Sequence, residues 1–244
     1  MRRWVMTRID PTMTLGALVN SRPELARELE RRGFDYCCGG TQTLAEACAS
    51  KGLDSTLTAS ELAAVVTAGV TEPWTTMDAV ELVEHLISTH HHYLWTELPR
   101  LSVLLAKIVS VHDERHPELH LIAACYEEVR ADLEPHLTRE EQVLFPMVRE
   151  LATAQSAPSF HCGSICNPIS VMLREHDAVG ELLVHLRELT DGYRLPADGC
   201  ASYEACFTGL AELEADTHLH IHKENNLLFP MVIAMENELS NASK

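Results

Sequence analysis

The pattern of apolar and polar positions in the second part of the chain is helical. From Met77 onward, apolar residues recur at spacings of three and four, as they do on one face of an α-helix. Breaks at residues 112–117, 156–168 and 191–200 divide this pattern. Short connections between long helices favour an up-down-up-down four-helix bundle. We expect the four helices at residues 77–110, 118–150, 167–192 and 202–238.

The first part of the chain predicts shorter helices. Thr14 is placed to cap a first helix, and Pro23 to begin a second helix that Gly33 ends. A third helix is expected at residues 44–50. The segment Thr58-Ala59-Ser60-Glu61 has the pattern of a capping box and predicts the start of a further helix there.

These patterns divide the chain into two domains and make it all-α. Thr71-Glu72-Pro73 is the expected linker, so residues 1–72 form a small helical domain and residues 73–244 form the bundle. Pro135 stands inside the second long helix, and we expect the helix to kink or restart there, because proline lacks an amide N–H.

A repeat inside the bundle is the strongest functional signal. His136-x-x-x-Glu140 and His220-x-x-x-Glu224 are both followed by Leu-Phe-Pro-Met-Val, at an offset of 220 − 136 = 84. A fainter echo in the other two helices, at 176 − 91 = 85, pairs His91 with His176. One such motif alone is usually a solvated pair of side chains. Two copies with the same flanking residues indicate two related helix pairs.

The spacing of the repeat predicts a metal site on the bundle axis. Four residues turn a helix by about 400°, so the His and Glu of each motif project from one face. Imidazoles with carboxylates favour iron, and two carboxylates can bridge two metals. We therefore expect two non-haem iron ions with an oxo or hydroxo bridge and an open position. The predicted ligands are His91, His136, Glu140, His176, His220 and Glu224.

Several nearby residues are candidates for supporting roles. Any residue of the run His90-His91-His92 could be the ligand, and His91 is preferred because it has the repeat partner. Asp132 and Asp216 each stand four residues before a predicted histidine ligand and could accept its other N–H, although a solvated acidic face explains them equally well. The weaker candidates for lining a channel or the site are Glu175 and His112.

Charge and composition narrow the function. With 19 basic and 36 acidic residues the formal charge is 19 − 36 = −17, which opposes binding to nucleic acid or to an anionic membrane. No apolar run of about 18 residues predicts a transmembrane helix, and the start of the chain lacks the apolar segment of a signal peptide. We expect a cytoplasmic protein whose eight cysteines are thiols.

The motifs together resemble a known family. His91, the two His-x-x-x-Glu segments and Glu175-His176-Asp177 look like the hemerythrin-like domain of the Repair of Iron Centers family, which are iron–sulfur cluster repair di-iron proteins. The segment of residues 33–40, Gly-Phe-Asp-Tyr-Cys-Cys-Gly-Gly, is similar to that family's amino-terminal domain. The longer loop with His161, Cys162 and Cys166 departs from the family pattern.

The resemblance implies a function and partners. It implies a cytoplasmic stress protein, usually a homodimer, with a μ-oxo di-iron centre bridged by Glu140 and Glu224. Such a protein reacts with NO and helps to restore damaged iron–sulfur proteins. The alternatives are a hemerythrin-like module that binds, scavenges or senses NO or O₂, and an enzyme such as an NO reductase or peroxidase.

The cysteines separate these alternatives. Cys37 and Cys38 precede Gly-Gly in an expected exposed turn, where thiols can exchange, be nitrosylated or bind a soft metal. A structural turn with ordinary thiols is the alternative. An accessible thiol pair favours repair or transfer over storage. The cysteines expected to be small core residues are Cys48, Cys125, Cys200 and Cys206.

Overall fold

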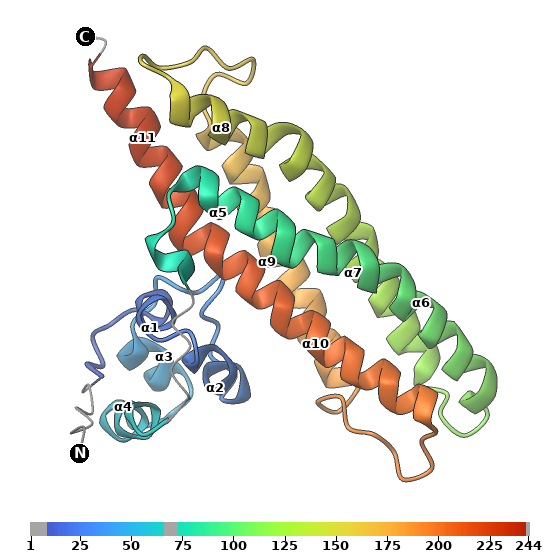
Figure 1. The fold of residues 1–244 in the computed structure, drawn as a ribbon. Coiled ribbons are helices and arrows are strands. Elements are labelled where there is room, and N and C mark those ends of the chain that lie inside the picture. The colour runs from blue at the N-terminus through green and yellow to red at the C-terminus, as the bar shows by residue number, and fades with distance from the viewer. Residues whose placement is uncertain (1–8, 66–72, 243–244) are drawn as a thin grey trace, which may run out of the picture. The chain divides into compact units, whose positions relative to one another are not determined.

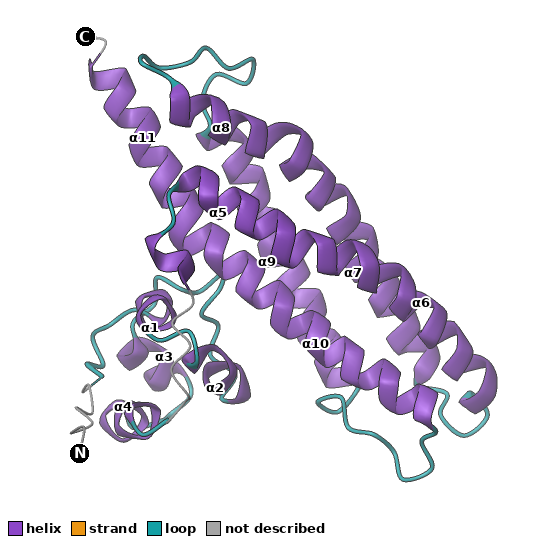
Figure 2. Cartoon of the chain, viewed as in Figure 1, coloured by secondary structure: helices purple, strands orange, loops and turns teal. Residues whose placement is uncertain are grey.

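The computed structural model describes residues 9–65 and 73–242, and its regular elements within these ranges are all helices. Figure 2 shows the helices joined by loops, and two isolated bridges are the only β-type pairings in the described ranges. The all-α class predicted from the sequence is confirmed. None of the described helices is both long enough and apolar enough to span a bilayer. The predicted linker residues Thr71 and Glu72 lie outside the described residues.

The chain forms two compact units, and one helical rod contributes to both. The first unit combines Met1–Met77 with Ile221–Pro230, and the second combines Asp78–His220 with Met231–Lys244.

The first unit contains short helices that begin and end at identifiable capping residues. As predicted, the Thr14 hydroxyl accepts the Ala17 amide at 3.2 Å, and Gly33 adopts a positive φ of 66° just after the second helix. The last α-helix begins at Ser55 with Asp54 as its cap, so the capping box expected at residues 58–61 is wrong. The Asp54 carboxylate accepts hydrogen bonds from two backbone amides, so the helix starts earlier than the sequence predicted. The helices are α1 (Leu15–Ser21), α2 (Leu25–Arg31), α3 (Leu44–Ser50), α4 (Ser55–Ala63) and the 3₁₀ turn η1 (Pro73–Thr76).

The second unit is built on four long rods that run side by side (Figure 1). Three of the rods contain a single π turn. The elements of the rods, in chain order, are α5 (Ala79–Leu86), η2 (Ile87–His91) and α6 (His92–His112); α7 (Leu119–Arg139), η3 (Glu140–Leu144) and α8 (Phe145–Thr153); α9 (Cys166–Leu189); and α10 (Ala201–Lys223), η4 (Glu224–Leu228) and α11 (Phe229–Ala242).

The π turns coincide with the motif residues. His91 ends η2, whereas Glu140 and Glu224 begin η3 and η4. In the last two, a Phe-Pro pair follows at once, and the proline has no amide N–H to continue the regular ladder. The Phe145 amide instead bonds to the Glu140 carbonyl five residues back. Such single π turns frequently occur at functional sites.

Pro135 does not restart the helix. The α7 helix continues through it to Arg139, and the change in pitch comes at η3. Leu133, His136 and Leu137 are buried on both sides of the proline, and this packing offsets the missing hydrogen bond. The expectation of a restart at Pro135 is therefore wrong.

The core of the bundle is a cluster of leucines and aromatic residues from all four rods. Tyr126 is fully buried and donates its hydroxyl proton to the Leu98 carbonyl at 2.7 Å. Leu98, Leu183 and Leu210 are also fully buried. This apolar packing holds the rods at fixed positions, so that side chains from different rods can meet reproducibly.

We expect Leu210→Ala to lower the free energy of unfolding by about 2–5 kcal/mol, because it leaves a cavity in this core. Val103→Ala is the matched control, since Val103 is 70% exposed on α6. Its effect should stay within about 0.5 kcal/mol. Urea unfolding followed by circular dichroism measures both. Equal midpoints for the two variants would contradict this description of the core.

Candidate metal centre

All six predicted ligands converge, in two groups that share both glutamates. In each group one ligand atom per residue lies within 4.8 Å of the others, and every member is buried. Each glutamate belongs to both groups, as bridging carboxylates would. The first group is His91, Glu140, His220 and Glu224, and the second is His136, Glu140, His176 and Glu224.

Glu140 lies at the centre of the site. Its side chain is fully buried, and neither carboxylate oxygen has a hydrogen-bond partner within the described part of the chain. Three imidazole Nε2 atoms face it: those of His91 and His136, both at 3.4 Å, and that of His220 at 3.8 Å. A buried carboxylate without hydrogen bonds is unfavourable unless a cation compensates it.

Glu175 sets the orientation of His136. Its carboxylate accepts the Nδ1–H of His136 at 2.9 Å and a hydrogen bond from Arg139 at 2.6 Å. Burial raises the pKa of Glu175, but these two hydrogen bonds outweigh it and lower the pKa to about 2. Because a carboxylate can only accept, the neutral His136 ring has its lone pair on Nε2. That atom faces Glu140, and it lies 3.2 Å from Nε2 of His176.

Glu141 holds His91 in the same way, and the sequence analysis missed it. The carboxylate accepts His91 Nδ1–H at 2.9 Å and Trp95 Nε1–H at 3.0 Å. Although burial raises the pKa of Glu141, the bonds from Trp95 and His91 lower it below its usual value. Glu141 has no counterpart in the other repeat, where Asn225 follows Glu224, so the repeat gave no signal for it.

These contacts show that the residues fit a cation. With their Nδ1–H groups donated to Glu141 and Glu175, the neutral His91 and His136 rings turn Nε2 lone pairs toward Glu140, and neither Glu140 oxygen accepts a hydrogen bond from them. A positive ion between such acceptors removes the conflict. Imidazole and carboxylate ligands suit first-row metals such as iron, and outer carboxylates on the imidazoles are typical of metal sites. Glu175 therefore lies where a supporting role was expected, beside His136.

Asp216 bonds to a histidine that stacks on the predicted ligand His220. Its carboxylate accepts from Nδ1 of His90 at 2.8 Å, and the His90 ring stacks on His220 with centroids 5.5 Å apart. The sequence placed Asp216 one helical turn before His220. The histidine run turns His90 toward Asp216, while His91 reaches the ligand groups and His92 is exposed.

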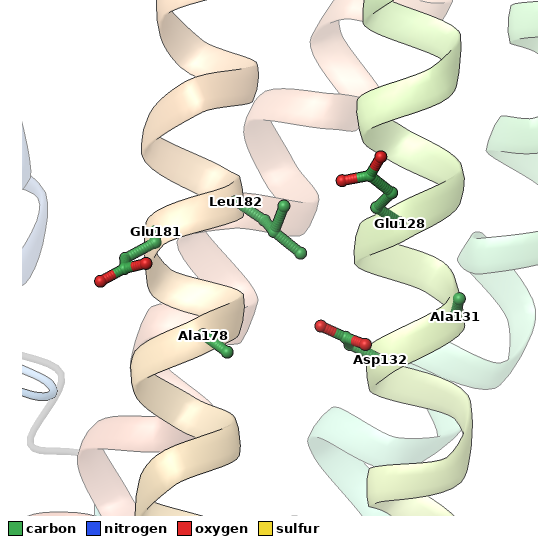
Figure 3. Close-up of a pocket in the computed structure, with 6 residues that line it drawn as sticks. All are labelled: Glu128, Ala131, Asp132, Ala178, Glu181 and Leu182. Atoms are coloured by element: carbon green, nitrogen blue, oxygen red, sulfur yellow. The ribbon is translucent and has the colours of Figure 1, made fainter.

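Asp132 and His112 do not lie at the metal centre. Asp132 is exposed and lines a surface cleft of about 430 Å³ between α7 and α9, together with Glu128 and Glu181 (Figure 3). His112 bonds to Cys200 instead. It stands 112 − 91 = 21 residues after His91 on α6, or roughly 30 Å along the helix. The supporting roles expected for Asp132 and His112 are therefore wrong.

The double-cysteine turn is more enclosed than expected. Cys37 is buried and Cys38 half-buried. The Asp35 carboxylate accepts the amides of Cys37, Cys38 and Gly39 and lies 3.2 Å from the Cys37 Sγ. The contact with Cys38, burial and the neighbouring Asp35 raise the pKa of the Cys37 thiol well above its ordinary value. The expectation of two exposed thiols is wrong for Cys37, because Asp35 folds the turn inward.

The turn is held against the helix segment that carries Glu224. Asn225 and Asn226 donate side-chain hydrogen bonds to the Cys37 carbonyl at 3.3 and 3.1 Å. A Cβ on Gly40 would collide with the Asn226 side chain, so only glycine permits this approach. His222 is fully buried here, with Nδ1 3.2 Å from the Tyr36 carbonyl oxygen.

Each part of the chain matches a known protein-family model. Residues 82–232 match the hemerythrin HHE cation binding domain, and residues 11–66 match the ScdA_N domain, described as a domain of unknown function. The first match covers more than half of the chain and contains all six predicted ligands.

Curated relatives extend over almost the full length. The chain is 35% identical to the iron–sulfur cluster repair protein YtfE of Enterobacter sp. (strain 638), over 91% of this chain and 97% of the relative. Proteins of the same name from Citrobacter koseri and Escherichia coli O81 are 34% and 33% identical, with the same coverage.

We expect purified protein to carry two irons per chain and Glu140→Leu to lose the spin-coupled pair, because Glu140 belongs to both ligand groups. The apolar replacement avoids leaving a buried charge, so the helices should remain folded. Glu150→Leu is the control, since Glu150 is exposed ten residues later in the same rod. Metal analysis with Mössbauer spectroscopy measures the outcome. A full coupled signal in Glu140→Leu, or zinc without iron in the wild type, would contradict the assignment.

Glu175→Gln should keep the fold but weaken iron binding by roughly 10- to 100-fold, because His136 loses the carboxylate that orients it. Glu188→Gln makes the same change at an exposed position of α9 and should bind iron like the wild type. Competition with a chelator measures the affinity. Equal affinities in the two variants would show that Glu175 does not support the site.

Proposed function

Since the chain belongs to the Repair of Iron Centers family and carries that family's hemerythrin HHE domain, we propose that it repairs iron–sulfur clusters damaged by nitrosative or oxidative stress. The observation that carries the proposal is the pair of buried carboxylates, each shared by two groups of histidines. Such a set is suited to two metal ions, and the relatives that match nearly the whole chain are named for cluster repair.

The six buried side chains would hold two non-haem irons. His91 and His220 would hold one iron and His136 and His176 the other, with Glu140 and Glu224 within reach of both. When bound, two irons would supply redox chemistry and a position where NO or O₂ binds. The protein excludes bulk water from this position, since every ligand side chain is buried.

The ligand set also favours reduction of the bound metal. Only Glu140 and Glu224 bring negative charge, and the four imidazoles are neutral when they coordinate. Ligands with little negative charge stabilise the ferric state less than the glutamate-rich sets of ferritin-like proteins do. Glu175 and Glu141 keep the rings of His136 and His91 in the tautomer that ligation requires.

The double-cysteine turn favours repair over storage of a small ligand. Cys38 is partly accessible, and the turn is bonded to Asn225 and Asn226, the two residues directly after Glu224. A storage protein has no need for thiols held at that segment. We propose that the turn contacts a damaged iron–sulfur protein, and that the protein acts in the cytoplasm as a homodimer.

We expect the reduced, iron-loaded protein to restore the activity of an NO-damaged [4Fe–4S] dehydratase beyond that of iron salt with thiol. Cys37→Ala/Cys38→Ala should retain its iron, because neither thiol belongs to the two ligand groups, but should lose most of the repair rate. Cys162→Ala/Cys166→Ala removes two other accessible thiols and is the matched control. Dehydratase activity and bound iron are measured in parallel.

The outcomes separate the candidate functions. Tight NO binding without recovery of the dehydratase would replace repair by NO binding or scavenging. Catalytic consumption of NO by the iron-loaded protein would indicate an NO reductase. Full repair by Cys37→Ala/Cys38→Ala would make that pair a structural turn, as its bonds to Asp35 also permit.

A further inference from the structure

A second cysteine–histidine arrangement lies in the bundle, outside the metal centre. Nε2 of His112, the last residue of α6, is 3.3 Å from Sγ of Cys200, directly before α10. His112 is only 4% exposed, while Cys200 is exposed to solvent. The expectation of Cys200 as a small core residue is therefore wrong, because it begins α10 at the surface. Its sulfur is open to reagents on one side and faces an imidazole on the other.

The start of α10 adds to the effect of the histidine. The Cys200 carbonyl accepts the Glu204 amide, which places its sulfur beside the first amides of the helix. The hydrogen bond to His112 and those to the amides of Tyr203 and Ser202 lower the pKa of the Cys200 thiol to about 7. Imidazole and helix amides both stabilise negative charge on sulfur, and such thiolates are nucleophilic near neutral pH.

The surroundings fix His112 rather than compete for it. The Tyr203 ring packs edge-on against the His112 ring, with the two centroids 5.4 Å apart. Burial raises the pKa of Tyr203 to about 12, so its hydroxyl stays neutral. Nδ1 of His112 is buried and has no hydrogen-bond partner among the residues that the structure describes. Within the described part of the chain, the ring's one hydrogen-bonding contact is thus the Cys200 sulfur.

The remaining charges near the pair are balanced among themselves. His116 lies next to His112, with ring centroids 6.3 Å apart. Asp198 and Glu118 both bond to His116 at 2.9 Å and raise its pKa. Arg115 pairs with Asp198 at 2.8 Å. The charge on His116 is therefore opposed by two carboxylates, and His112 remains the direct partner of the thiol.

We propose that Cys200 and His112 form a reactive thiol site, separate from the metal centre, that undergoes thiol–disulfide exchange with a small disulfide such as oxidised glutathione. The Cys200 thiolate attacks one sulfur, a new S–S bond forms, and the original S–S bond breaks. One glutathione leaves as a thiolate and takes up from solvent the proton that the Cys200 thiol released when it ionised. Cys200 is oxidised to the mixed disulfide, and the released glutathione is the reduced half. The inference does not depend on the proposed repair function.

Burial separates Cys200 from two other cysteines of the bundle. Cys125 and Cys206 are buried, and burial raises the pKa of both thiols. Cys166 is the informative comparison, because it is also exposed and also begins a long helix, α9. No histidine is hydrogen-bonded to the Cys166 thiol in the described ranges. The two positions thus share exposure and a helix start, and they differ in the imidazole and in the amide hydrogen bonds that Cys200 receives from Tyr203 and Ser202.

The test is the rate at which the iron-loaded protein forms the mixed disulfide with oxidised glutathione between about pH 6 and pH 9, read at each cysteine by peptide mass spectrometry. The Cys200 rate should have its midpoint near pH 7. An ordinary thiol ionises near about 8.5, and a lower pKa also reduces nucleophilicity. The net advantage of Cys200 over Cys166 should be roughly threefold at pH 7 and roughly sixfold at pH 6.

Two variants test the part that the histidine plays. His112→Gln should move the Cys200 midpoint upward by about one pH unit or more, with iron content and circular dichroism unchanged. His116→Gln replaces the neighbouring ring, which does not touch the Cys200 sulfur, and should shift the Cys200 midpoint less than His112→Gln does. The proposal is overturned if Cys200 reacts no faster than Cys166 below pH 7. A folded His112→Gln protein with the wild-type midpoint would also overturn it. If His112→Gln does not fold, the wild-type comparison of Cys200 with Cys166 decides alone.

Discussion

The fully buried carboxylate of Glu140 is the constraint on which the bundle depends. It faces imidazole nitrogens of His91, His136 and His220, and none of them forms a hydrogen bond with it. Leaving an ionised carboxylate in such a place is unfavourable unless a cation or proton compensates it. The apolar core of the four rods holds it there nonetheless. Metal binding and the stability of the bundle are therefore coupled, because bound metal stabilises only the folded arrangement.

The carboxylates of Glu175 and Glu141 orient two of the histidine ligands around Glu140. Glu175 and Glu141 hold the Nδ1 atoms of His136 and His91, so the Nε2 lone pairs face inward. The π turns place His91 and Glu140 at the points where their rods depart from regular pitch. Ligands on rods with fixed packing and oriented rings are prepared for metal before it arrives, which lowers the reorganisation that binding requires.

The cysteines have three different environments in one fold. Cys37 is buried against Asp35 and resists ionisation, whereas Cys206 is a core residue. Cys200 is exposed beside His112, and its pKa is lowered. Reactivity of a thiol follows the stability of its thiolate and its access to reagents. The number of cysteines therefore says little about redox chemistry. The residue beside each sulfur determines how reactive that thiol is.

The sequence by itself predicted the all-α class, the long helices of the bundle and the six candidate ligands, because these follow from helical periodicity and from the repeat at an offset of 84 residues. The His-x-x-x-Glu spacing places both side chains on one face, and the repeat shows which helices correspond. Only the tertiary structure decided which carboxylate bonds to which histidine. Glu141 bonds to His91, and Asp216 bonds to His90. His112 and Cys200, 200 − 112 = 88 residues apart, meet because two rods end beside each other. Such contacts depend on helix rotation and packing between rods, which one-dimensional spacing does not specify.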